Sequence, residues 1–210
     1  MAYRSGVNLQ EVEPQAELYV PEPARIVKVE PQTAKEKLFE VELTSGRALG
    51  HGPGQFVQVF VPGIGEAPIS LCSYRPGCSS FQLCVRNVGT VTAALHGLRP
   101  GALIGLRGPL GKGFAMDEIK GHDLLIVGGG IGLVPLRGVV QAILAERDQY
   151  GRVIILAGFK SPEEILFRSE LEQWEQREDI EFAITIDRPH PGWGGHVGVI
   201  TTLFPELRLD

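Results

Sequence analysis

Cysteine is scarce in this sequence, and neither sign of charge is concentrated in one stretch of it. The three cysteines, Cys72, Cys78 and Cys84, are an odd number, which argues against a disulfide framework. They include no C-x-x-C pair of the kind that zinc and iron–sulfur sites usually use, so we expect no metal site. The formal net charge of −5 disfavours nucleic acid as a partner, because nucleic-acid binders carry a basic surface.

A secretory leader and a membrane-spanning run are also missing. The first residues contain no apolar segment of the signal-peptide type. The most apolar stretch, residues 124–145, includes three successive glycines, Pro135 and Arg137. It therefore predicts a buried strand, turn and helix instead of a membrane span. On these grounds we expect a cytoplasmic protein.

Glycine and proline, by contrast, are abundant, with 27 and 15 residues, which is typical of a chain with many turns. Between the turns, the first half of the sequence has six short segments rich in β-branched and aromatic residues. This succession predicts an all-β sandwich or barrel. The expected strands are 24–30, 37–43, 55–61, 69–73, 81–86 and 102–107, with one helix at 91–97.

After Gly121 the pattern changes to apolar runs that alternate with helical segments. Such runs are typical of strands buried on both faces of a parallel sheet, joined by right-handed crossovers. The expected strands are 123–127, 152–157 and 180–186, and the expected helices are 132–147 and 162–177, the second capped by Ser161. We therefore divide the chain into an N-terminal arm at 1–22, a β domain at 23–117 and an α/β domain at 118–210.

The most specific local motif is the glycine-rich turn between the first apolar strand and the following helix. Its predicted ligand-binding residues are Gly128, Gly129, Gly130, Ile131 and Gly132. Glycines let the backbone approach a pyrophosphate, and the helix N-terminus supplies free N–H groups and a positive dipole end. The motif is not a strict G-x-G-x-x-G, because proline takes the third small position. The alternative is a plain glycine-rich turn of a doubly wound sheet.

An acidic residue at the end of the second apolar strand, which would bind a ribose hydroxyl, is missing. Lys160 follows that strand, while Asp187 and Arg188 follow the third. Asp187 can accept a hydrogen bond from ribose, and either cation can contact a 2′-phosphate. Each can equally be an ordinary loop charge, so the choice between NADH and NADPH stays open. The glycine-rich segment 192–198 is also expected near the nucleotide.

Four motifs together resemble the ferredoxin–NADP reductase superfamily. They are Pro68-Ile69-Ser70, the segment from Val85 to Thr92, Gly108-Pro109-Leu110-Gly111, and the glycine-rich turn. Within that superfamily the sequence is most similar to electron-transfer subunits of dihydroorotate dehydrogenase and gamma subunits of sulfhydrogenase-type nickel–iron hydrogenases. The resemblance implies a Greek-key β-barrel that binds FAD, followed by a truncated doubly wound α/β lobe that binds NAD(P).

The resemblance also implies the flavin contacts. Ser70 is the predicted catalytic residue, with its hydroxyl near flavin N5, where hydride arrives. Ala67 stands where many relatives have an arginine, so another group must hold the pyrophosphate. Helix capping is an alternative role for Thr90 and Thr92. The predicted flavin contacts are Pro68, Ile69, Ser70, Val85, Arg86, Val88, Gly89, Thr90 and Thr92.

Relatives of this kind continue with a further strand that carries a C-G-P motif, and electron-transfer subunits add a cysteine cluster for a [2Fe–2S] centre. This sequence reaches Asp210 before either feature. We therefore expect an α/β lobe of only three strands, an exposed sheet edge and no iron–sulfur cluster bound by this chain.

These observations favour a flavin-dependent reductase module that passes hydride and electrons between NAD(P)H and an iron–sulfur partner through FAD. The expected partners are iron–sulfur, hydrogenase or dehydrogenase subunits in a hetero-oligomer. A non-catalytic flavin-carrying or scaffolding subunit of a larger redox complex is the alternative. A dinucleotide-dependent dehydrogenase without flavin is a third. Ser70 lacks a G-x-S-x-G context, which disfavours a hydrolase.

Overall fold

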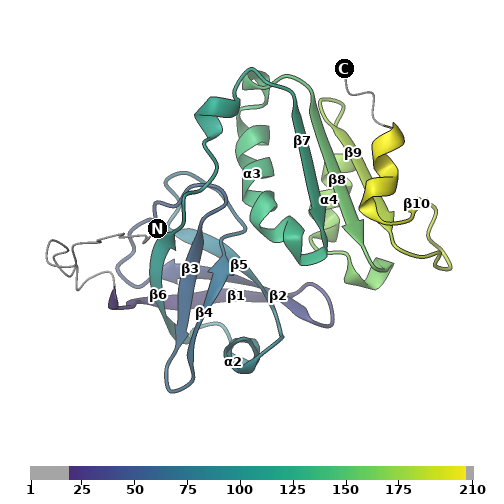
Figure 1. Cartoon of the computed structure of the whole chain (residues 1–210). Helices are drawn as coiled ribbons and strands as arrows, with labels where there is room; N and C mark the ends of the chain where they lie inside the picture. The colour runs from purple at the N-terminus through teal and green to yellow at the C-terminus, as the bar shows by residue number, and fades with distance from the viewer. Residues whose placement is uncertain (1–18, 207–210) are drawn as a thin grey trace, which may run out of the picture.

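The computed structural model describes residues 19–206 and shows a β-barrel joined to an α/β lobe (Figure 1). Most of the expected N-terminal arm, residues 1–18, lies outside the described part of the chain. The barrel contains β1 (Glu22–Pro31), β2 (Glu36–Leu43), β3 (Phe56–Val61), β4 (Gly65–Ser70), β5 (Ser80–Arg86), α2 (Thr90–Gly97) and β6 (Leu103–Leu110).

The six barrel strands are paired in the order β4-β3-β6-β1-β2-β5, and all neighbours are antiparallel. A bridge between Leu71 and Leu83 connects the end of β4 with β5 and closes the barrel. The all-β prediction is confirmed, but the fourth strand was expected at 69–73. Pro68 weakens the strand signal there, and it is tolerated because β4 pairs along its length only with β3.

The α/β lobe is built on a parallel sheet in the order β10-β9-β8-β7. Helices α3 and α4 pack on the face that presents Val153 and Ile155, and the 3-10 helix Ile200–Glu206 packs on the other face. Every residue of β8 is buried between these layers. The elements are β7 (Leu124–Gly129), α3 (Leu133–Ala145), β8 (Val153–Phe159), α4 (Arg168–Glu175), β9 (Glu181–Ile186) and β10 (His196–Val197).

Two expectations for the lobe were wrong. A fourth, two-residue strand, β10, pairs with β9, so the sheet has more than three strands. The helix expected at 162–177 is split into a 3-10 turn at Pro162–Glu164 and α4. Phe167 interrupts it with a left-handed φ of 52°. The cause is the run Ile165 to Phe167, which is entirely buried: three successive side chains of one continuous helix point in different directions and cannot all face one sheet.

One edge of the parallel sheet is open in the described part of the chain. There β7 is hydrogen-bonded to β8 alone, and Leu125 is 40% exposed. A groove of about 450 Å³ lies beside β7, between Phe114 and the side chains of α3. The expected exposed edge is therefore present, and it belongs to the strand that leads into the glycine-rich turn.

The barrel and the lobe share part of their hydrophobic core. Leu38, Cys72 and Cys84 of the barrel belong to the same buried cluster as the side chains of α3 and β8. A separate cluster around Val57 and Val59 fills the barrel itself. The two halves are therefore packed against each other through apolar side chains and not merely tethered.

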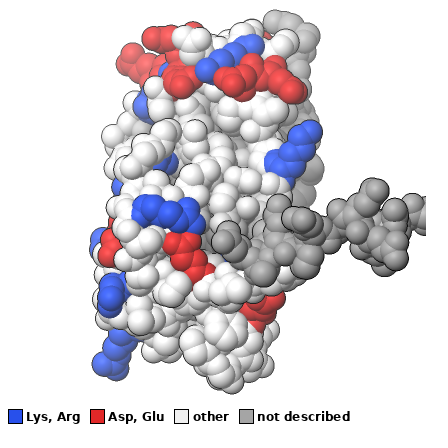
Figure 2. All heavy atoms as spheres, turned by 90° about the vertical axis from the view of Figure 1, so that its left-hand side faces the viewer, with Lys and Arg blue, Asp and Glu red and all other residues white. Residues whose placement is uncertain are grey.

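Charged side chains are unevenly distributed on the face of the molecule that lies on the left-hand side of Figure 1. In Figure 2, acidic and basic side chains gather in a band at the top, and the described residues across the middle carry few charges. This face has no continuous basic surface of the type that nucleic acid requires. In residues 19–206, no helix combines the length and apolar character needed to cross a bilayer.

Candidate functional site

The glycine-rich turn lies between the end of β7 and the start of α3, at the carboxyl edge of the parallel sheet. Gly130 has a left-handed φ of 51°, which glycine adopts without strain. A Cβ on the buried Gly128 would lie 3.0 Å from the Cα of Leu133, so only glycine lets the helix start this close to the strand. The turn thus presents the N-terminus of a 13-residue helix, an arrangement suited to phosphate binding.

A pocket of about 290 Å³, here called the junction pocket, opens at the same edge. The glycine turn and the end of β8 form much of its wall, and Arg86 of the barrel completes it from the other half of the molecule. Ligands of open α/β sheets bind in this position, outside the carboxyl ends of the strands. The structure therefore brings a barrel residue and the predicted nucleotide turn to one cavity.

Of the three strand-end charges predicted to contact a nucleotide, two line the junction pocket and one does not. Lys160 and Asp187 both line the junction pocket and are exposed to solvent. Arg188 is exposed but is not among the residues that line this pocket. Of the two cations considered for a 2′-phosphate, only Lys160 lies in the pocket wall.

Five residues that line the pocket were not among the predicted site residues: Gly158, Phe159, Glu164, Val199 and Ile200. Ile200 packs on the end of β8, where a Cβ on Gly158 would lie 2.9 Å from the Ile200 Cβ. The only sequence signal was the glycine-rich segment 192–198, which leads directly to these two aliphatic residues. Glu164 reaches the pocket because the expected helix is broken into a turn at this point.

The Pro68-Ile69-Ser70 motif forms the end of β4, with side chains on both sides of the strand. Ile69 is paired with Val57 and packs against the barrel core. Pro68 and Ser70 point to the opposite side, because side chains alternate along a strand. The Ser70 hydroxyl is half-buried and makes no hydrogen bond to the described residues. It is therefore free to donate to a ligand.

The segment from Val85 to Thr92 leads from β5 into α2. Val85 is 1% exposed and packs in the barrel core, and its carbonyl is bonded to His96 (2.8 Å), so the structure leaves this predicted flavin contact almost no surface for a ligand. Val88 is 75% exposed, and Gly89 and Thr90 are open to solvent. Gly89 and Thr90, at the exposed end of this segment, are the residues that the resemblance predicts to contact the flavin pyrophosphate.

Thr92 caps the start of α2. Its hydroxyl accepts hydrogen bonds from the N–H groups of Val88 (3.0 Å) and Gly89 (2.9 Å) and donates to the Gly89 carbonyl (3.0 Å). These bonds use the full capacity of a hydroxyl group. Thr92 therefore organises the turn, while the N–H groups at the first helical positions remain open, as at any helix N-terminus.

Arg86 is held by a buried carboxylate. Its Nε donates to Glu36, a residue of β2 that is only 2% exposed. Glu36 also accepts a hydrogen bond from the Thr33 hydroxyl. The ion pair fixes the direction of the Arg86 side chain at the edge of the junction pocket, since a buried carboxylate without its partner is strongly unfavourable.

This residue set fits a flavin dinucleotide. The free Ser70 hydroxyl, the exposed apolar Val88 and the open N-terminus of α2 supply a donor, an apolar cover and an anion site. Ala67 supplies no cation beside this residue set, while the N-terminus of α2 offers N–H donors to an anion.

The three cysteines do not form one cluster, although Cys72 and Cys84 belong to the same buried core. Cys72 and Cys84 are buried free thiols and Cys78 is exposed. Burial raises the pKa of Cys72 to about 11, against the weaker opposing effect of Arg137, and burial raises the pKa of Cys84 as well. Within residues 19–206, no three His, Cys, Asp or Glu side chains are placed to bind a metal ion together.

Two family models match the chain in succession. Residues 23–114 match the oxidoreductase FAD-binding domain, and residues 126–207 match the oxidoreductase NAD-binding domain. The first model covers β1 to β6 and the second covers the lobe from β7 onward. The residues of both proposed ligand sites therefore fall inside the matched segments.

Three relatives share substantial identity with the chain. Sulfhydrogenase 2 subunit gamma of Pyrococcus furiosus is 42% identical over 151 residues, which cover 70% of this chain and 52% of that protein. A probable dihydroorotate dehydrogenase B (NAD(+)) electron transfer subunit of Methanothermobacter thermautotrophicus is 36% identical, covering 73% and 54%. Ferredoxin–NADP reductase B of Sorangium cellulosum is 33% identical, covering 88% and 77%.

The matched part spans about half the length of the first two relatives. Among solved structures, the Amycolatopsis cytochrome P450 reductase GcoB superimposes with a TM-score of 0.75 at 25% identity, covering 88% of this chain and 57% of that one.

Proposed function

Because this chain belongs to the ferredoxin–NADP reductase family, with an FAD-binding domain and an NAD-binding domain, we propose that it is an NAD(P)H-dependent flavin reductase module. Electrons would leave it for an iron–sulfur partner in a hetero-oligomeric complex, as the gamma-subunit and electron-transfer-subunit relatives suggest. The free thiols Cys72, Cys78 and Cys84 fit a reducing, cytoplasmic compartment. We place the domain division at residues 117 and 118.

The observation that carries this proposal is the junction pocket. It places Arg86, at the end of a barrel strand, beside the glycine-rich turn of the lobe. A flavin held by the barrel and a nicotinamide held by the lobe must meet at such a junction. FAD, when bound, supplies the hydride-accepting and electron-releasing chemistry, and the protein supplies binding and orientation.

The roles of the residues follow from their positions. The α2 N-terminus with Gly89 and Thr90 would bind the flavin pyrophosphate, and the Ser70 hydroxyl would donate to the flavin ring. The glycine turn would bind the nucleotide pyrophosphate, with Asp187 on a ribose hydroxyl or Lys160 on a 2′-phosphate. No general acid or base is required, which agrees with the absence of a proton-transferring partner for Ser70 among the described residues.

The test is an anaerobic titration of the purified, FAD-reconstituted protein with NADH and, separately, with NADPH. We expect loss of the oxidised flavin absorbance with at least one of them, and reoxidation by an iron–sulfur protein. A flavin that stays oxidised with both nucleotides would support the non-catalytic carrier instead. A protein that binds no flavin would contradict both and leave the flavin-free dehydrogenase.

A further inference from the structure

Arg137 of α3 is a buried cation that binds both halves of the molecule. It is 7% exposed, yet its Nη1 donates to the Cys72 carbonyl (2.9 Å) and to Gln82 Oε1 (2.8 Å) of the barrel. Its Nε forms an ion pair with Glu170 of α4. The Phe167 ring stacks on the guanidinium, 4.6 Å from Cζ to the ring centroid. Both halves thus hold one side chain from several directions.

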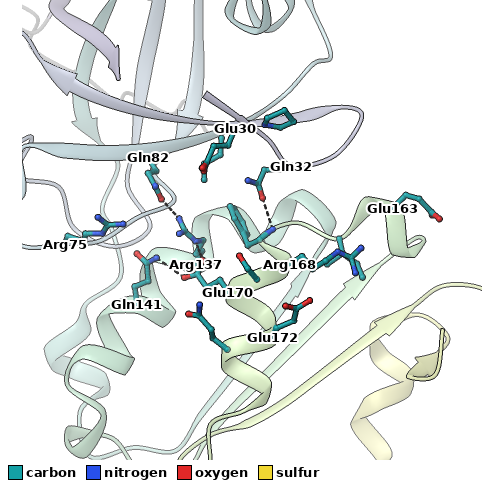
Figure 3. A pocket seen from close by; sticks show the side chains of 16 residues that line it. Glu30, Gln32, Arg75, Gln82, Arg137, Gln141, Glu163, Arg168, Glu170 and Glu172 are labelled. Carbon is teal, nitrogen blue, oxygen red and sulfur yellow. Dashed lines mark hydrogen bonds and ion pairs between the residues drawn. The ribbon is translucent and has the colours of Figure 1, made fainter. Parts of the chain in front are cut away.

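Two more side chains, Gln141 and Gln32, extend this contact into a polar seam. Gln141 Oε1 accepts from the Tyr74 N–H (2.9 Å), and Gln141 Nε2 donates to Glu170 (3.0 Å). Gln32 of the barrel accepts from the Phe167 N–H (3.0 Å). Figure 3 shows these groups converging at a cavity of about 680 Å³ between the barrel and the two helices. We call Gln32, Gln82, Arg137, Gln141 and Glu170 the junction seam.

The seam is close in sequence to both proposed ligand elements. Arg137 lies five residues after Gly132, within the helix that the glycine turn begins. The Cys72 carbonyl lies two residues after Ser70, at the end of β4. Gln82 lies on β5, the strand that ends at Arg86. One guanidinium therefore connects the nucleotide-binding helix with the segment that carries the flavin donor.

A buried ion pair is a poor device for stability alone, because apolar side chains of similar volume stabilise an interface as well or better. A guanidinium does what apolar groups cannot: its fixed fork of donors selects one orientation of its partners. We therefore propose that Arg137 is a positioning residue, which holds the Ser70 segment and the glycine turn at the separation that hydride transfer requires. This inference rests on the proposed function.

Geometry at this junction would control the reaction rate steeply. Hydride transfer needs the reacting atoms in near contact, and a displacement of about 1 Å can slow a reaction roughly 100-fold. Arg137 touches neither proposed ligand, so its loss should slow transfer without preventing binding. That combination separates positioning from a direct catalytic or binding role.

Three variants loosen the seam from different sides. Gln82→Leu removes the side-chain acceptor in the barrel and leaves the Cys72 carbonyl and the ion pair in place. Arg137→Lys keeps the charge but lacks the fork. Arg137→Met with Glu170→Gln removes both charges together, so that neither is left buried and unpaired. Arg75→Gln is the matched control, because Arg75 is an exposed arginine on the wall of the same cavity.

The first measurement is the rate of flavin reduction in a single turnover of FAD-loaded protein at saturating nucleotide. We expect the seam variants to be at least tenfold slower than the parent protein, with flavin content and nucleotide dissociation constant within threefold. Arg75→Gln should match the parent protein. Seam variants that keep the flavin and reduce it within twofold of the parent rate would overturn the proposal.

The second measurement does not depend on activity. Nitroxide labels on the exposed Cys78 of the barrel and on Glu178→Cys of the lobe report the distance between the halves by double electron–electron resonance. The seam variants should broaden the distance distribution, and an unchanged distribution would overturn the proposal. If the parent protein is reduced by neither nucleotide, the proposed function fails, while the label distances still decide whether the seam fixes the two halves.

Discussion

At the scale of single residues, Gly129 offers the cleanest test of the nucleotide turn. It lines the junction pocket, and its backbone is extended, with φ −106° and ψ 127°, which suits a β-branched residue. A Cβ there would meet only the Gly158 carbonyl oxygen, at 3.9 Å. Gly129→Val should therefore fold normally but fill the space where phosphate must approach. We expect the NAD(P)H dissociation constant to rise at least tenfold.

The control for that change is Gly128→Val on the same strand. A Cβ at Gly128 would lie 3.0 Å from the backbone of Leu133, so this variant should lower the melting temperature as well as nucleotide affinity. Calorimetry and fluorescence titration measure the two effects separately. Equal affinity of Gly129→Val and the parent protein would show that the nucleotide does not bind at this turn.

A second residue-scale prediction concerns Cys72. Its pKa is raised by burial to about 11, so folding favours the protonated thiol. The resulting stabilisation is complete below the pKa of an unfolded cysteine, near 9, and is lost as the pH rises towards 11. The total effect is on the order of 2–3 kcal/mol. Urea denaturation at pH 8, 9 and 10 should show a declining free energy of unfolding.

Cys72→Ala should show a shallower decline with pH than the parent protein, whatever its stability at pH 8. Cys78→Ser replaces an exposed thiol and should retain the parent slope. Identical slopes for all three proteins would mean that the Cys72 thiol does not resist ionisation in the fold.

At the scale of elements, the strands of the lobe should differ in local stability. All of β8 is buried and paired on both sides, whereas the described neighbours of β7 lie on one side only. Backbone amides that are not hydrogen-bonded within a sheet exchange through low-energy openings. Hydrogen exchange of the isolated chain should therefore be slowest in residues 153–159 and clearly faster in residues 124–129. Equal protection of both strands would indicate that another segment covers the β7 edge.

At the scale of the whole molecule, the shared core and the junction seam should couple the unfolding of barrel and lobe. FAD at 100 times its dissociation constant stabilises the folded state by about 2.7 kcal/mol. For a protein of this size that corresponds to a rise in melting temperature of roughly 5–10 °C. Calorimetry should show one transition that moves as a unit. Two transitions, of which FAD shifts only the first, would mean that the halves unfold independently.

Much of this architecture was predictable from the sequence, because the pattern of apolar residues and glycines in each segment agrees with the element that the segment forms. Short apolar runs rich in β-branched residues, such as 152–157, are typical of strands buried on both faces, and the glycines between β7 and α3 indicate a turn. The break at Phe167 was not predictable, because it depends on a buried surface and on a hydrogen bond to Gln32, a residue far away in the sequence.

The candidate site was predictable to a similar extent. Motif reasoning singled out Arg86 and the glycine turn, which line the junction pocket, since each sits at a strand end next to a turn. The role of Ser70 stays a prediction. Motif reasoning did not find Ile200, because nothing in its neighbours links it to Gly158 before the chain is folded. It read Arg137 only as a charge that argues against a membrane span. The partners of Arg137 lie on β5, on α4 and beyond β4, and only the tertiary structure brings them together.

The hairpin formed by β1 and β2 restricts where homologous chains can gain or lose residues. Gln32, at the start of the turn, binds the lobe, and Glu36, directly after the turn, orients Arg86 in the junction pocket. Surface hairpins are usually the places where homologous chains gain or lose residues. Here one inserted residue would shift both contacts at once, so length variation in this family should avoid residues 32–35 and accumulate in the exposed loop at 76–79.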